Sequence, residues 1–189
     1  MVRSAQHATG VADYGIQGRE RPVLSPTIVA RTSSEVSAKG NEMIETTTTE
    51  QRVAVARDFV DRVFNAHDGE RARDFFSSDI TFHALTVGNL SGIDTVVPVL
   101  VGFIDALSDI EAQVQDVIAS GDLVALRQVV KAHHTGTLLG IPATGRSIQW
   151  DAVDIYRVND EGKITEQWAF EDFAAILSQA GDVKLPWAW

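Results

Sequence analysis

Hydrophobic and polar positions follow two different periods along this chain. Between residues 47 and 107 the apolar side chains recur every three or four positions, which predicts helices at about 47–66, 70–76 and 91–107. Within that region only the short segment 79–85 alternates, and it predicts a strand. From residue 110 onward the period is two, so the second half of the chain is predicted to be mainly strand.

The alternating half divides into strands at about 110–119, 123–134, 147–158 and 163–172. Short turns that contain glycine, at 120–122 and 159–162, join them into two hairpins. A last helix, 173–180, ends at Gly181, as a C-cap glycine predicts. Helices that precede a meander of strands predict an α+β fold, in which helices cover one face of a curved antiparallel sheet. Such a cone encloses a pocket between its sheet and its helices.

The chain has 189 residues, enough for one ordinary hydrophobic core and too few for two domains of usual size. Residues 47–181 carry the periodic pattern and are predicted to form the cone domain. Residues 1–46 are rich in Gly, Ser, Thr and Ala without a sustained period, so we expect a disordered or loosely attached extension. Residues 182–189 form a tail that contains Trp187 and Trp189.

The net charge is −10, and residues 1–46 contribute equal numbers of acidic and basic groups, so the whole excess lies in 47–189. An acidic body argues against nucleic acid and membrane surfaces as partners. The absence of cysteine excludes disulfides, a thiolate nucleophile and a Cys-ligated zinc ion. No apolar run approaches the ~18 residues of a membrane span, and no secretory signal is present, so we expect a cytoplasmic protein.

Asp172 is the first candidate for proton transfer. Counted by the period of two, it shares a strand face with Ile164, Glu166, Trp168 and Phe170. A carboxyl group beside Trp and Phe is costly to ionise, so we expect its pKa to be raised. The alternative is that Asp172 caps the helix that follows, as Asp often does.

Asp154 is the second candidate, on a strand face that also carries Trp150 and Tyr156. If Val158 pairs with Ile164 across the hairpin, Asp154 lies opposite Trp168 and Trp150 opposite Asp172, unless a β-bulge shifts the register. Two acids in an apolar cavity divide acid and base roles in many enzymes. The alternative for Asp154 is a structural carboxylate that holds backbone or Arg127.

Three further side chains are candidates. His134, at a strand end before a Gly-containing loop, and His83 are possible acid/base or binding groups. His133 and His134 point to opposite faces of a strand, so we expect no metal site. Arg127 lies in an otherwise apolar strand, where it is expected to pair with a carboxylate or to orient a substrate oxygen.

Several motifs in the second half together resemble the SnoaL-like polyketide cyclases, also called ester cyclases, of the nuclear transport factor 2-like superfamily. The resemblance covers roughly residues 48–181. It is carried by Gly121-Asp-Leu-Val-Ala-Leu-Arg127, His134-Thr-Gly136, Gly140-Ile-Pro-Ala-Thr-Gly-Arg146, Tyr156-Arg157, Gly162-Lys-Ile164, Glu166-Gln-Trp168, Asp172 and Gln179-Ala-Gly181.

The resemblance implies an α+β cone that dimerises through its sheet and uses no metal or organic cofactor. It also implies that Asp172 is the general acid/base of an intramolecular aldol condensation on a polyketide-like substrate. We therefore expect a cofactor-independent cyclase or isomerase for an apolar, carbonyl-bearing small molecule. His134 and Asp154 are the expected assistants of Asp172, and the expected pocket residues are Trp150, Trp168, His83, Arg127, Tyr156 and Phe170.

Two alternatives remain open at this stage. Epoxide opening by water would need Asp154, Arg127 and Asp172 to converge. A non-catalytic binding module would be indicated if Trp168, Phe170 and the tail tryptophans filled the cavity.

Overall fold

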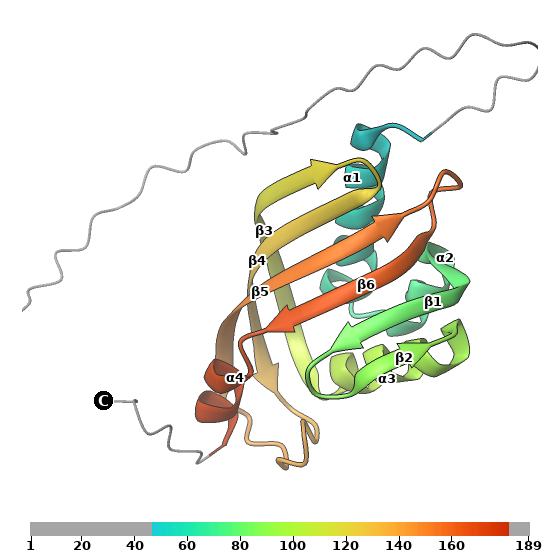
Figure 1. Cartoon of the computed structure of the whole chain (residues 1–189). Helices are drawn as coiled ribbons and strands as arrows, with labels where there is room; N and C mark the ends of the chain where they lie inside the picture. Colours follow the sequence, from blue (N-terminus) through green and yellow to red (C-terminus); the bar gives the residue numbers. More distant parts are fainter. Residues whose placement is uncertain (1–46, 182–189) are drawn as a thin grey trace, which may run out of the picture.

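The described part of the chain, residues 47–181 of this computed structural model, opens with a helix that begins in a capping box. The backbone amide of Gln51 donates to Thr48 Oγ1 (3.2 Å), and the amide of Thr48 donates to Gln51 Oε1 (2.6 Å). This helix, α1, continues as a π-helical segment from Val60, which is the first of the eleven elements that follow α1 along the chain. Figure 1 shows their arrangement. The order is α1 (Thr49–Phe59), η1 (Val60–Asn65), η2 (Gly69–Arg71), α2 (Ala72–Phe75), β1 (Phe76–Ala84), β2 (Gly88–Ser91), α3 (Ile93–Asp105), β3 (Leu107–Ser120), β4 (Leu123–His134), β5 (Ser147–Val158), β6 (Ile164–Glu171) and α4 (Phe173–Ala180).

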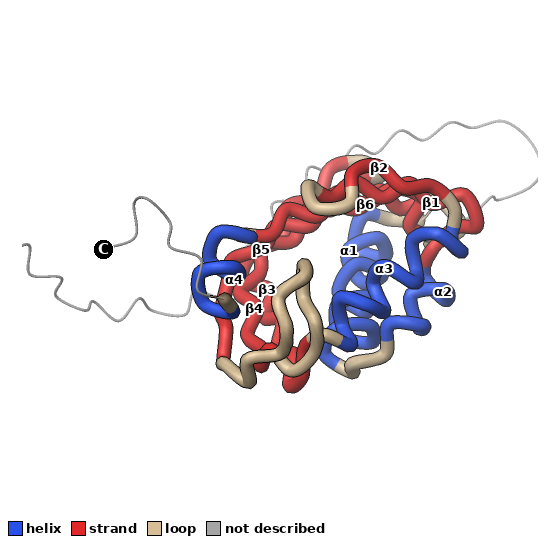
Figure 2. The backbone as a smooth tube through the Cα atoms, turned by 90° about the horizontal axis from the view of Figure 1, so that it is seen from below, coloured by secondary structure: helices blue, strands red, loops and turns tan. Residues whose placement is uncertain are grey.

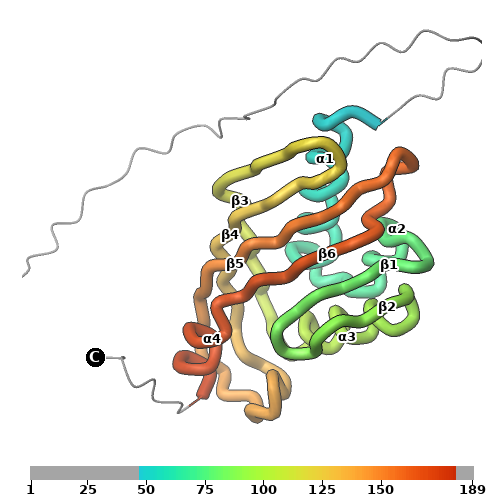
Figure 3. Tube along the Cα trace, viewed as in Figure 1, coloured from blue at the N-terminus to red at the C-terminus, as the bar shows by residue number. Residues whose placement is uncertain are grey.

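The six strands form one sheet in the order β2-β1-β6-β5-β4-β3. All neighbours are antiparallel except β1 and β6, which are parallel (Figure 3). The α+β cone is therefore confirmed, with one parallel pair in an otherwise antiparallel sheet. The sequence analysis did not predict β2, which is only four residues long.

The sheet curves around the helices, and Figure 2 shows α1, α2 and α3 together on its concave side. The core lies between these two layers, where Phe59 makes aromatic contacts with Phe75, Phe76 and Tyr156. Helix α4 lies elsewhere, along the edge of β5 beyond the end of β6. There the side chain of Gln179 replaces a strand partner, since it accepts from the Gln149 amide (3.0 Å) and donates to the Gln149 carbonyl (2.7 Å).

A β-bulge at Thr165 sets which side chains of β6 face the concave side. Val158 pairs with Ile164 as assumed, but Arg157 pairs with Glu166, so Thr165 is an extra residue. Beyond it the alternation is shifted by one position. Gln167 is buried, whereas Phe170 is 57% exposed on the outer face.

This shift corrects the predicted pairing of the hairpin. Asp154 lies opposite Ala169 instead of Trp168, and Glu171 lies opposite Ala152. The concave face of β6 thus carries Gln167, Ala169 and Glu171, the set that uninterrupted alternation assigned to the other face. No helix within residues 47–181 is long and apolar enough to cross a bilayer. The predictions for residues 1–46 and 182–189 lie outside the described residues.

Candidate active site

A cavity of about 60 Å³ lies between the concave face of the sheet and the helices. Its walls are mainly apolar, and its polar side chains include two acids, Asp154 and Glu171. The lining residues are Phe64, Phe82, Ala84, Thr86, Val87, Val99, Leu100, Phe103, Asp154, Gln167, Ala169, Glu171 and Phe173. Four phenylalanines among them offer ring faces and edges to an aromatic or alicyclic ligand.

A second, smaller cavity of about 10 Å³ lies beside the first. Its own walls are formed by β3, β4 and β5, through Ile110, Ala112, Gln128, Val130, Trp150 and Ala152. Phe64, Phe103, Asp154 and Glu171 line both cavities. The two acids therefore lie where the outer and inner cavities meet.

Asp154 is only 4% exposed and receives two hydrogen bonds from carboxamides. Gln128 Nε2 donates to Oδ2 (2.7 Å), and Gln167 Nε2 donates to Oδ1 (3.1 Å). Burial raises the pKa of Asp154 to about 6, and the two amide donors oppose that rise because they favour the charged form. This carboxyl group is thus placed to exchange a proton near neutral pH.

Glu171, the last residue of β6, is half-buried because its side chain faces the open cavity. Trp150 Nε1 donates a hydrogen bond to Glu171 Oε2. Burial raises the pKa of Glu171 to about 8, and the nearby charge of Asp154 adds to that rise. Because the charge of Asp154 disfavours ionisation of Glu171, the two carboxyl groups release their protons in separate steps.

Tyr156 is a second buried polar residue on β5, two residues beyond Asp154. Its side chain is fully buried, and its ring contacts Phe59 edge-on. Burial, with the charges of Asp154 and Glu171, raises the pKa of the Tyr156 hydroxyl well above its usual value. The phenol therefore remains neutral at physiological pH.

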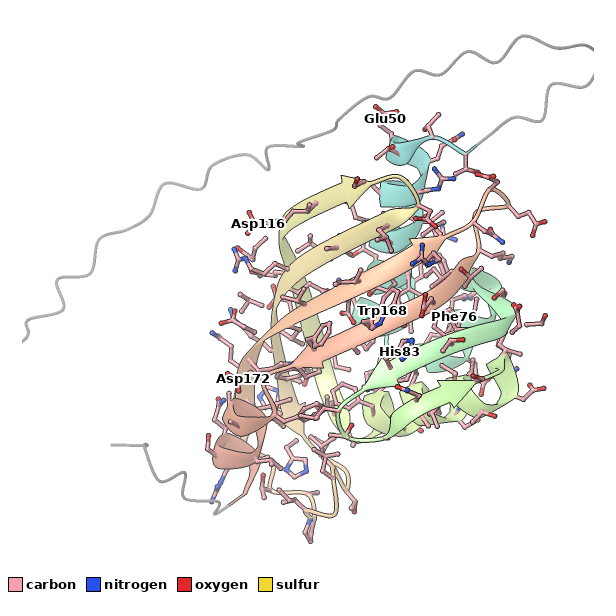
Figure 4. The ribbon with its side chains drawn as sticks, viewed as in Figure 1. Glu50, Phe76, His83, Asp116, Trp168 and Asp172 are labelled. Atoms are coloured by element: carbon pink, nitrogen blue, oxygen red, sulfur yellow. The ribbon has the colours of Figure 1, made fainter. Side chains whose placement is uncertain are left out.

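Asp172 does not face either cavity, which corrects the expected orientation of its side chain. It is exposed, and its Oδ1 accepts from the Ala175 amide (2.9 Å) as the N-cap of α4. Figure 4 shows it at the end of β6, beside α4. The capping alternative is the arrangement found, because the bulge at Thr165 brings Glu171 inward in its place.

His83, Trp168 and Phe170 lie on the outer face of the sheet, which corrects their expected place in the pocket. The ring of His83 stacks on Trp168 with centroids 5.3 Å apart, as Figure 4 illustrates. His83 Nε2 lies 2.9 Å from Glu166 Oε1, and this pairing contributes to a raised His83 pKa, together with a larger contribution from Asn89. Trp168 and Phe170 therefore do not fill the cavity; the tail tryptophans lie outside the described residues.

Arg127 and His134 also lie away from both cavities. Arg127 is exposed on the outer face and pairs with Asp116 (Nε to Oδ2, 2.6 Å), so its predicted carboxylate partner is present. Since Asp154 faces the opposite side of the sheet, the three groups needed for epoxide opening do not converge. His134 is fully buried, with Nδ1 3.0 Å from Thr144 Oγ1, and it lines neither cavity.

Three polar residues of the site were not predicted from the sequence: Gln128, Gln167 and Glu171. Gln128 could have been found from the sequence, because it is the one amide side chain in the inward-facing row of β4. The other members of that row include Val124, Leu126, Val130 and Ala132. Gln167 and Glu171 required knowledge of the bulge. Among residues 47–181, no three His, Asp or Glu side chains group together in a way that could hold a metal ion.

The sequence matches a known protein family. The model of the SnoaL-like polyketide cyclase family matches residues 54–180, well over half of the chain. The chain belongs to the SnoaL-like polyketide cyclase family. Nogalonic acid methyl ester cyclase from Streptomyces nogalater is 34% identical to it over 90 residues, which are 47% of this chain. The match spans 64% of that relative's length, slightly less than two thirds.

Solved structures share the fold of this family member. AclR from Streptomyces galilaeus is 26% identical with a TM-score of 0.64, and the match covers 72% of this chain and 100% of AclR. A protein from Jannaschia sp. CCS1 has a TM-score of 0.65 at 18% identity, covering 78% of this chain and 100% of its own. At that identity the second likeness concerns the fold alone.

Proposed function

We propose that this chain is a cofactor-independent cyclase in which Asp154 is the base. It acts on an apolar, carbonyl-bearing, polyketide-like small molecule. The main support is the position of the Asp154 carboxyl group, which is 4% exposed and lies at the junction of two largely apolar cavities. Burial there raises its pKa to about 6. A hydrogen on carbon beside a carbonyl is weakly acidic, so a desolvated carboxylate suits its removal.

The reaction is an intramolecular aldol-type cyclisation. Asp154 takes the proton from the carbon beside one carbonyl, and the resulting enolate carbon attacks a second carbonyl of the same molecule. One C–C bond forms, and the new alkoxide receives the proton held by Asp154. Substrate and product are isomers, so the step needs no external oxidant or reductant.

The first substrate to test is nogalonic acid methyl ester, because the curated relative is named for its cyclisation. A second assay uses 1-tetralone, a bicyclic ketone, whose hydrogens beside the carbonyl exchange for deuterium in D₂O. This exchange isolates the proton-removal step and does not depend on the natural substrate.

Asp154→Asn is expected to slow both reactions by about 100-fold or more, the contribution of one acid/base group. Asp172→Asn is the matched comparison, because the family resemblance implies the same role for that residue. Unchanged turnover in Asp154→Asn, with a large loss in Asp172→Asn, would reject Asp154 as the base. Binding of 1-tetralone without exchange in the wild type would instead indicate a binding module.

A further inference from the structure

The carboxyl group of Glu171 has one hydrogen-bond partner in the described part of the chain, and that partner favours protonation of the other oxygen. The indole nitrogen of Trp150 can only donate, so Glu171 Oε2 must accept. The carbonyl oxygen of a carboxylic acid is the stronger acceptor, so this hydrogen bond favours the proton on Oε1. Glu171 lines both cavities, so its carboxyl group belongs to the site.

The surrounding charges favour a neutral Glu171. Asp154 is the ionisable group that acts on it, and no Lys, Arg or His among residues 47–181 lines either cavity. The helices that cover the site contribute apolar side chains here, including Phe64, Val99 and Phe103. Without a cation nearby, the repulsion between two neighbouring carboxylates favours the state in which one of them is protonated.

The hydrogen bonds decide which of the two acids keeps the proton. Asp154 accepts from two amide nitrogens, Gln128 Nε2 and Gln167 Nε2, whereas Glu171 accepts from the single indole of Trp150. Donors stabilise the charged form of a carboxyl group, so Asp154 ionises first. The arrangement places a carboxylate and a carboxylic acid side by side in one cavity.

We propose that Glu171 is a second catalytic residue, a neutral acid that donates the hydrogen on Oε1 to the substrate carbonyl oxygen, and that Trp150 is its positioning residue. This proposal rests on the proposed function of Asp154. As Asp154 removes the C–H proton, the electron pair moves to the carbonyl oxygen, which takes the proton of Glu171 and becomes an enol. When the enol carbon forms the new C–C bond, its O–H proton returns to Glu171, and Asp154 protonates the new alkoxide.

The direct test is a titration of the full chain labelled with ¹³C at glutamate side-chain carboxyl groups, followed by NMR. The resonance absent from Glu171→Gln identifies the residue, and its midpoint is expected near pH 8. Trp150→Phe is expected to move that midpoint upward, because the charged form loses its donor. Asp154→Asn is expected to move it downward, because the neighbouring charge is removed.

Trp168→Phe is the matched control for Trp150→Phe, because Trp168 lies on the outer face of the same sheet and is expected to leave the midpoint unchanged. A Glu171 midpoint near 4.3, the ordinary value for glutamate, would overturn the proposal. So would an equal shift in both tryptophan variants.

Deuterium exchange of 1-tetralone supplies the second readout. Glu171→Gln is expected to lower its rate by about 10-fold to 100-fold, since the amide still donates a hydrogen bond but cannot transfer a proton as readily. Full exchange activity in Glu171→Gln, with activity lost in Asp154→Asn, would reject this proposal and leave the proposed function intact. Full activity in Asp154→Asn would reject the proposed function, whatever the Glu171 midpoint.

Discussion

Asp154 and Glu171 lie one diagonal step apart on adjacent strands, since Asp154 pairs with Ala169 and Glu171 pairs with Ala152. Diagonal neighbours in an antiparallel pair are about 7–8 Å apart, within reach of side chains that point to the same face. Both carboxyl groups face the same cavity, where burial raises both pKa values.

The carboxamides beside Asp154 should set the pH at which the base becomes active. Asp154 must be ionised to remove a proton, so the exchange rate is expected to rise as the pH passes about 6. Gln128→Leu or Gln167→Leu removes a donor that favours the charged form, which raises the Asp154 pKa. The rise in rate should therefore move to higher pH, measured as the pH profile of 1-tetralone exchange.

Gln113→Leu is the control for these two variants, because Gln113 is an exposed glutamine on β3 whose amide donates to Glu111. Its profile should match that of the wild type. An unchanged profile in both Gln128→Leu and Gln167→Leu would mean that the amides do not tune Asp154.

Glu171 should make the fold less stable as the pH rises. Its folded pKa of about 8 exceeds the ordinary glutamate value of about 4.3, so the folded state binds more protons between these values. The free energy of unfolding should therefore fall with increasing pH across this window. Glu171→Gln removes this dependence, and its advantage over the wild type should be largest above pH 8 and absent near pH 4, measured by urea denaturation.

Asp172→Asn provides the contrast in the same denaturation series, since its exposed side chain has no comparable burial. An Asn at this position still caps a helix, so the loss of stability should be small. A pH dependence in Glu171→Gln as steep as that of the wild type would contradict the prediction.

A larger side chain at Ala169 should fill the outer cavity. Ala169 lines that cavity directly opposite Asp154 on the neighbouring strand. Ala169→Phe is expected to weaken binding of 1-tetralone at least ~10-fold, because the ring occupies the ligand's space. Val153→Phe, on the outer face of β5, is the control, and both affinities can be measured by calorimetry. Equal weakening in the two variants would indicate that the ligand binds elsewhere.

The outer face of the sheet is where we propose that a second copy of the chain binds. Two large apolar side chains are exposed there, Phe170 on β6 (57%) and Ile118 on β3 (66%). Burying them against another chain would release apolar surface from water. Phe170→Glu is expected to shift the protein from dimer to monomer in analytical ultracentrifugation, and a wild type that sediments as a monomer would reject the interface.

Much of the fold could be predicted because its signals are local. The alternation in residues 147–158 correctly placed Trp150, Asp154 and Tyr156 on the inward face, and Gly162 lies in the turn between β5 and β6 as expected. Strand β2 and the parallel pairing of β1 with β6 carried no comparable signal, because a four-residue strand has too few positions to show a period.

The sequence alone determined that an acid near the end of the last strand follows aromatic residues and precedes a helix. Only the tertiary structure decided which acid faces the cavity. Glu171 and Asp172 are consecutive, yet Glu171 lines the cavity while Asp172 caps α4. The physical reason is the extra residue at Thr165, which exchanges the two faces of β6. Such a bulge depends on how β6 pairs with its neighbours, and the pattern of apolar and polar residues within β6 does not reveal it.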